Sequence, residues 1–154
     1  MVRDIDYDLI ARVTEAAAAS PRRRMNFNFH SGPEDNPHRF LNAMLRGTYI
    51  QPHRHLKPPK AEAFLALRGS GCVVTFDDAG AVVDRHFIGE GHASYGVDIA
   101  AGVWHTIVPL SEVLVCYDVK PGPWDPSTDK EFAEWAPAEG SHEVESYASG
   151  ILNS

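Results

Sequence analysis

Between residues 40 and 120 the sequence is a series of short runs rich in β-branched and aromatic residues, which glycine, proline or aspartate interrupts repeatedly. Runs of this length and composition are typical of strands. The runs that predict strands are 48–55, 63–67, 72–76, 82–87, 95–99, 104–108 and 113–119. Residues 77–80, Asp-Asp-Ala-Gly, predict a hairpin turn between two of them. Many short strands at near-regular spacing favour a sandwich or a barrel.

The two ends of the chain differ from this middle part. Asp6 can cap a helix that carries a single apolar stripe, and Ser20-Pro21 ends it because the residue before a proline is pushed out of the α region. Residues 25–30 alternate between apolar and polar, which predicts a further strand, and a weak helix is expected around 130–135. We therefore expect a helix and arm over 1–24, a β-barrel over 25–120 and a C-terminal extension over 121–154.

Length and charge limit the classes of function. A chain of 154 residues can form one core, and we expect a single domain. Its net charge of −7 should repel a phosphate backbone, so nucleic acid is not an expected partner. No apolar run approaches the ~20 residues that span a bilayer, so no membrane association is expected. The N-terminus does not read as a secretory signal, and Cys72 and Cys116 fit two reduced, buried thiols. We expect a cytoplasmic protein.

Two histidines one residue apart are the strongest chemical signal. Successive strand side chains point to opposite faces, so His53 and His55 share a face and can both reach one cation. Glu62 comes on the next predicted strand and His105 begins a later one. Lone histidines are often surface or core residues, but this spacing favours one divalent metal ion. Three imidazoles and a carboxylate suit Zn, Fe, Mn, Ni or Cu, and the sequence does not choose among them. Glu62 remains open as a ligand or as a neighbouring carboxylate.

These residues stand in patterns that resemble a known family. Gly-x5-His-x-His-x6-Glu-x6-Gly, over residues 47–69, resembles the first cupin motif, and Ala-x-Gly-x-x-His, over 100–105, resembles the second. The interval between His55 and Glu62 is longer than that motif usually has, and Ala100 replaces a proline. The segments 20–30, 38–39, 52–55, 104–106, 120–126 and 135–139 resemble the WbuC family of cupin-fold metalloproteins over nearly the whole chain.

The resemblance implies a mostly β fold, a cupin barrel (double-stranded β-helix, jelly-roll-like) of two facing antiparallel sheets, with an N-terminal helix and a short C-terminal extension. It also implies a homodimer, because cupins commonly pair through a sheet edge. Members of the family are associated with surface-polysaccharide (O-antigen) biosynthesis, without a firmly established reaction. A fold by itself does not name a substrate.

Further residues are candidates for contact with a substrate. Tyr49 and Gln51 share the face of His53 in a regular strand, so we expect them to face the barrel interior. Tyr49 is a candidate catalytic acid or hydrogen-bond donor, and its alternative is a packed wall residue. Arg24, His30 and Arg39 are expected to line the open end of the barrel, where arginine suits carboxylates and phosphates. Their alternative is a solvated strand face.

Three functions are compatible with this set. The first is an enzyme whose metal acts as a Lewis acid on a sugar-like or small-metabolite substrate, with isomerisation or epimerisation as the reaction. The second is a non-catalytic small-molecule or sugar-binding module with a structural or sensing metal. The third is an Fe-dependent, dioxygenase-like oxidoreductase.

Overall fold

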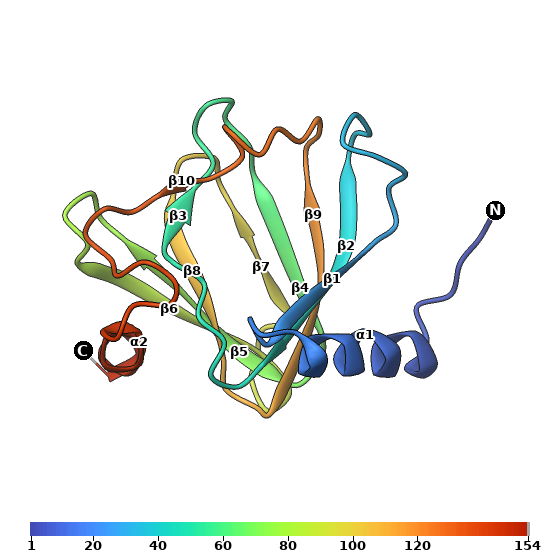
Figure 1. The fold of residues 1–154 in the computed structure, drawn as a ribbon, viewed down its shortest axis with the longest axis horizontal. Coiled ribbons are helices and arrows are strands. Elements are labelled where there is room, and N and C mark those ends of the chain that lie inside the picture. The colour runs from blue at the N-terminus through green and yellow to red at the C-terminus, as the bar shows by residue number, and fades with distance from the viewer. Residues whose placement is uncertain (154) are drawn as a thin grey trace.

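The computed structural model describes residues 1–153, which form two facing five-stranded antiparallel sheets flanked by two helices (Figure 1). The first sheet has the order β1 (Arg24–Asn28), β2 (His38–Leu45), β9 (Val113–Lys120), β4 (Glu62–Arg68), β7 (Gly96–Ile99). The second has the order β10 (Glu131–Phe132), β3 (His53–Arg54), β8 (Trp104–Pro109), β5 (Ser70–Phe76), β6 (Val82–Gly89). The helices are α1 (Tyr7–Ala19) and α2 (Val144–Asn153).

The core lies between the sheets, and the two-residue period of the strands fills it. On β9, Leu114 and Cys116 face the second sheet, whereas Val115 between them faces outward. The interior cluster draws on strands of both sheets and consists of Met44, Phe64, Val73, Ile88, Ile99, Ile107, Leu114 and Cys116. This apolar layer occupies one half of the sandwich, and polar side chains occupy the other half.

Helix α1 covers the outer face of the first sheet, as the sequence predicts. Asp6 caps it, because its carboxylate accepts a hydrogen bond from the Leu9 N–H at 2.9 Å. The buried stripe Leu9, Val13 and Ala17 packs against outward-facing side chains of β2 and β9. The helix ends at Ser20, immediately before Pro21.

The C-terminal extension covers the outer face of the second sheet. Cys72, Val74 and Phe76 of β5 pack there against Ala133 and Ile151. Figure 1 shows α1 and α2 on opposite sides of the sandwich. Cys72 and Cys116 are both free and buried, as expected.

The strand expected over 48–55 is wrong for most of its length, because only His53–Arg54 pairs as a strand. Pro52 lacks an N–H, and side chains bind the preceding carbonyls: Arg24 donates to the Tyr49 carbonyl and Thr106 to that of Ile50. These carbonyls therefore accept hydrogen bonds from side chains rather than from the backbone of a neighbouring strand.

One other expectation about local structure is also wrong, and two elements were not expected. The helix expected at 130–135 is the short strand β10, which pairs with β3. Strand β2 and helix α2 were not expected, because leucine, alanine and methionine in β2 favour helix over strand.

The two sheets are not closed into a continuous barrel. β7 ends one sheet and β6 ends the other, so the barrel expected from the sequence is an open sandwich along this seam. No helix among residues 1–153 is long and apolar enough to cross a membrane.

Candidate metal centre

Four buried side chains meet between the sheets at the polar half of the sandwich. His53 on β3 stands directly opposite His105 on β8, and His55 follows β3. Glu62 begins β4 of the facing sheet. Each of the four residues is at most 6% exposed, and their potential ligand atoms all lie within 4.8 Å of one another. The structure therefore brings together the four residues that the spacing of the sequence selected.

The loop before β8 joins the two histidine motifs. Gly102 has φ +82°, a conformation that residues with a Cβ rarely adopt. Its N–H donates to the His55 carbonyl at 3.1 Å. The glycine of the second motif thus allows the backbone turn that carries the chain into His105.

The three imidazole rings are oriented by backbone carbonyls. His53 Nδ1 contacts the Gln51 carbonyl at 3.0 Å and His105 Nδ1 contacts the Val103 carbonyl at 2.8 Å. His55 Nδ1 contacts the carbonyl of Asp129 in the C-terminal extension. A carbonyl oxygen only accepts hydrogen bonds, so each Nδ1 carries a proton and donates it. Nε2 is then the atom left for the interior: with a proton it donates to Glu62, and without one its lone pair is the form that binds metals.

The Nε2 atoms and the carboxylate face one another. Glu62 Oε2 lies 2.9 Å from His55 Nε2 and 3.3 Å from His105 Nε2. Burial raises the pKa of Glu62, but hydrogen bonding to His105 and His55 lowers it more, and the pKa lies well below its usual range. Burial, and repulsion by His105, hold the pKa of His53 well below its usual range. An anionic carboxylate and a neutral imidazole thus share one dry space.

This donor set fits a divalent transition metal. Bonds to histidine nitrogen and carboxylate oxygen are about 2.0–2.2 Å long, so donors on opposite sides of one ion lie about 4 Å apart. The four ligand atoms all lie within 4.8 Å of one another, and Glu62 Oε2 lies 2.9 and 3.3 Å from two of the nitrogens, so one ion could contact all four. Three imidazoles and a carboxylate complete a tetrahedral shell, whereas a metal that takes five or six ligands keeps open positions.

A buried ionic network that the sequence did not reveal lies beside these donors. Lys120 Nζ is 2.9 Å from the carboxylate of Asp129, and Lys60 Nζ is 3.9 Å from it. All three residues are at most 6% exposed. A lysine is ordinarily expected at the surface, and charge alone does not reveal that Lys120 is buried. Its two-residue spacing from Asp118, along the interior face of β9, was the available signal.

Asp118 is a further buried carboxyl, with 1% exposure. Burial, and the negative charge of Glu62, raise its pKa well above the usual range. Asn42 Nδ2 lies 3.5 Å from Asp118 Oδ2. Among the described residues no hydrogen-bond partner contacts Asn42 Oδ1 or Asp118 Oδ1, so both buried oxygens are unpartnered.

The family comparison decides the chain's membership. The model of a domain of unknown function, DUF6016, matches residues 5–88, which is more than half of the chain. The chain belongs to the DUF6016 family. The matched part includes His53, His55 and Glu62, while His105 lies outside it. No curated protein matches the sequence.

Solved structures share the fold of this DUF6016 chain at low sequence identity. CapF, the capsular polysaccharide assembling protein of Staphylococcus aureus, aligns with a TM-score of 0.59 and 22% identity over 71% of this chain and 29% of its own. TT1209 from Thermus thermophilus aligns with a TM-score of 0.56 and 16% identity over 79% of this chain and 98% of its own. The fold is therefore cupin-like. The chain spans less than a third of CapF.

Tyr49 and Gln51 do not share the face of His53. The Tyr49 hydroxyl donates to the Pro137 carbonyl at 2.8 Å, and Gln51 Nε2 donates to the Ala133 carbonyl at 3.0 Å. Burial raises the pKa of Tyr49 above its usual value. The regular alternation expected for 48–55 is absent because that segment is not a strand. Both side chains fasten the C-terminal extension of this DUF6016 chain instead.

Arg24 lies apart from His30 and Arg39, whereas the His30 ring contacts the Arg39 backbone, with Nδ1 3.1 Å from the Arg39 nitrogen. Arg24 forms a two-pronged ion pair with Glu139 at 2.9 Å. Arg39 alternates with the inward-facing residues of β2 and so shares the face of Leu41, on the α1 side. His30 stacks on His38 with ring centroids 3.9 Å apart. The structure therefore does not bring these three residues together around one opening.

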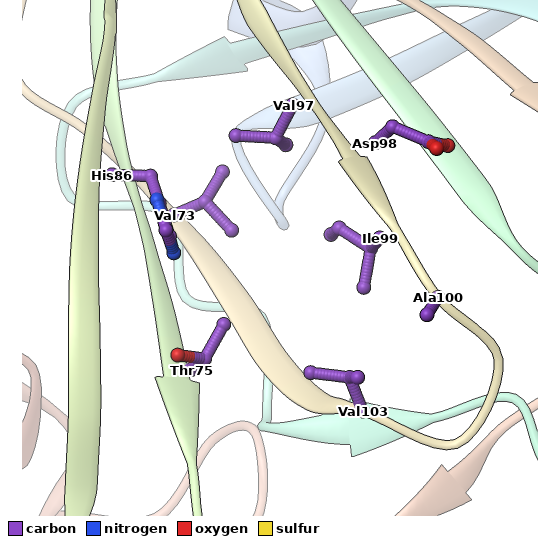
Figure 2. Close-up of a pocket in the computed structure, with 8 residues that line it drawn as sticks. All are labelled: Val73, Thr75, His86, Val97, Asp98, Ile99, Ala100 and Val103. Atoms are coloured by element: carbon purple, nitrogen blue, oxygen red, sulfur yellow. The ribbon is translucent and has the colours of Figure 1, made fainter.

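A pocket of about 350 Å³ opens at the seam between the two sheets (Figure 2). Figure 2 shows mainly aliphatic side chains around it, from β5, β7 and the loop before β8, together with His86 of β6 and Asp98 of β7. Two lining residues are register partners of the candidate ligands: Thr75 stands opposite His105, and Ile99 opposite Glu62. The seam of this DUF6016 chain is thus the candidate route to the metal centre.

Proposed function

We propose that this protein binds one divalent transition-metal ion through His53, His55, His105 and Glu62 and acts on a small-molecule substrate there. The observation that carries the proposal is the orientation of the rings. Three Nδ1 atoms donate to backbone carbonyls, which directs three Nε2 atoms toward one buried carboxylate. Buried charges are paired or coordinate metals, and a cation satisfies this cluster of acceptors.

A bound ion would supply a Lewis acid that polarises a substrate oxygen. The chain's own residues would hold the ion, exclude water by burial and admit a substrate through the seam pocket of about 350 Å³. Asp118 and Asn42 each have a buried oxygen without a hydrogen-bond partner among the described residues, and a hydroxyl group, which both donates and accepts, would satisfy either one. These features favour a sugar-like or other hydroxyl-bearing metabolite and an isomerase- or epimerase-like reaction.

The biological setting of the proposal comes from the sequence resemblance. The motifs resemble the WbuC family, whose members are associated with surface-polysaccharide biosynthesis. CapF, whose fold this chain shares, is named as a capsular polysaccharide assembling protein. We propose a cytoplasmic homodimer with a role in surface-polysaccharide biosynthesis.

A non-catalytic binding protein with a structural or sensing metal is the second candidate. The observation that favours it is the low exposure of all four donors, because a closed four-ligand site is typical of structural zinc. An Fe-dependent oxygenase is the third, and it depends only on the identity of the ion.

The test is the metal content of untagged protein, purified without chelators, measured by inductively coupled plasma mass spectrometry. The proposal expects about one equivalent of a transition metal in the wild type and its loss in His53→Ala and His105→Ala. His142→Ala, at an exposed histidine outside the cluster, is the matched control and should retain the metal. Absence of metal from the wild type, also after metal is added back, would refute the metal centre.

A second measurement separates an enzyme from a structural site. Water-proton relaxation of the Mn²⁺-loaded protein detects exchangeable water on the ion. Enhanced relaxation supports a site open to substrate, whereas the absence of enhancement in a loaded protein favours the structural role.

A further inference from the structure

The C-terminal residues 129–133, here called the clamp segment, lie along the free side of the histidine strand. Phe132 pairs with His53 in register, and the Ala133 N–H donates to the Pro52 carbonyl at 2.9 Å. The carbonyl of Asp129 accepts from His55 Nδ1. The clamp segment thus touches two of the three histidines, although it lies more than 70 residues away in sequence.

A buried ion pair ties the clamp segment to the opposite sheet. Lys120, the last residue of β9, places Nζ 2.9 Å from the Asp129 carboxylate, and both residues are nearly inaccessible. Lys60 Nζ lies 3.9 Å from the same carboxylate and also donates to the Pro123 carbonyl, which precedes the clamp segment, at 2.6 Å. β9 pairs with β4, the strand that begins at Glu62. The ion pair therefore connects the sheet that carries the carboxylate to the segment that orients His55.

Stability alone gives no reason for this ion pair. Two charges lose their hydration when they are buried, and an apolar pair of similar volume is often as stable. What a charge-assisted hydrogen bond does supply is fixed geometry. Here the fixed element is the backbone of Asp129, whose carbonyl determines where the His55 ring points.

We propose that Lys120 is a positioning residue of the metal centre, which acts through Asp129 to hold the His55 ring with Nε2 toward the cluster. The inference rests on the proposed metal function. It adds that metal binding and docking of the clamp segment are coupled. Docking of the clamp segment strengthens metal binding, and by thermodynamic reciprocity metal binding strengthens docking of the clamp segment.

The direction in which one substitution changes the metal affinity separates a positioning role from a purely electrostatic one. Lys120→Met removes a positive charge near the cation, so a purely electrostatic role predicts tighter metal binding. Positioning predicts the opposite, a weakening of about 10- to 100-fold, as for other residues that orient metal ligands. Asp129→Asn should also weaken binding. Zn²⁺ affinity is measured by chelator competition, and the absorption spectrum of the Co²⁺-loaded protein reports the ligand geometry.

Glu139→Gln is the matched control, because it breaks a different ion pair that fastens the same extension ten residues further on. It should leave the Zn²⁺ affinity and the Co²⁺ spectrum unchanged. If wild-type protein binds Zn²⁺ and Lys120→Met binds it as tightly or more tightly, the positioning role is refuted while the metal centre stands. If the wild type binds none, both are refuted.

A measurement on the wild type alone covers the case in which the variants fail to fold. Hydrogen exchange of the Ala133 amide, which donates to Pro52, is followed in the chelator-treated and the Zn²⁺-loaded protein. If metal binding and docking are coupled, the Ala133 amide should exchange more slowly in the Zn²⁺-loaded protein. The Leu9 amide of α1 should exchange at the same rate in both. Equal exchange at Ala133 in a protein that binds Zn²⁺ would refute the coupling.

Discussion

At the scale of single residues, the direction of each imidazole is set by a carbonyl on a different segment. Gln51 and Val103 are local to their histidines, whereas Asp129 belongs to the C-terminal extension. A histidine with its Nδ1 occupied offers only Nε2 to the interior. The candidate site thus depends on backbone positions as much as on the four side chains.

Replacement of Glu62 by glutamine tests whether this residue is a ligand. The amide keeps the size of the side chain but removes the anionic donor, so Zn²⁺ affinity should fall about tenfold or more. Chelator competition measures the affinity. Glu112→Gln, at a glutamate that is 80% exposed in its side chain, is the control and should bind as the wild type does. Equal affinity in Glu62→Gln would exclude the carboxylate as a ligand.

At the scale of elements, the N-terminal cap of α1 should contribute measurably to stability. Asp6 accepts the Leu9 N–H at 2.9 Å, so Asp6→Ala leaves that donor without its partner. We expect the free energy of unfolding to fall by about 1 kcal/mol. Urea denaturation measures it, and Asp4→Ala, at an exposed aspartate that precedes the cap, should change it much less. Equal losses in both variants would contradict the cap.

The ion pairs that join Glu139 of the C-terminal extension to Arg22 and Arg24 should make the stability of the fold depend on pH. Hydrogen bonds from Arg22, and then Arg24, lower the pKa of Glu139 from 4.5 to about 2. A depressed carboxyl pKa stabilises the fold above pH 4.5 and loses that contribution as the pH falls toward 2. Because Glu139 is partly exposed, we expect only about 1 kcal/mol between wild type and Glu139→Gln at pH 6. Urea unfolding should show this difference vanish near pH 2; a constant difference would contradict it.

The sequence predicts some elements better than others for physical reasons. The α1 stripe, the strands from 63 to 119 and the four clustered donors follow local periodicity and spacing, which the sequence displays directly. Tyr49 was misplaced because non-local hydrogen bonds from Arg24 and Thr106 replace strand pairing before His53. Lys120 and Asp129 were missed because their burial arises from contacts between segments, including the ion pair that joins them across 9 residues.

At the scale of the whole molecule, three apolar clusters divide the fold into layers. α1 packs on one sheet, the extension packs on the other, and the interior cluster lies between the sheets. Both outer faces near the site are covered, whereas the edges β6 and β7 are not joined into a barrel. The pocket at this seam is therefore the candidate route of a small molecule to the donors.

Narrowing of the seam should slow access to the metal without changing the site. Ala100 is exposed at the edge of the pocket, so Ala100→Trp adds bulk there without overfilling the core. In stopped-flow experiments we expect a chelator to remove Zn²⁺ severalfold more slowly from this variant, while the equilibrium affinity stays equal to that of the wild type. Ala79→Trp, at an exposed turn away from the pocket, should leave the rate unchanged. Unaltered removal in Ala100→Trp would contradict the seam as the route and would direct the search to the opposite edges of the sheets, β1 and β10.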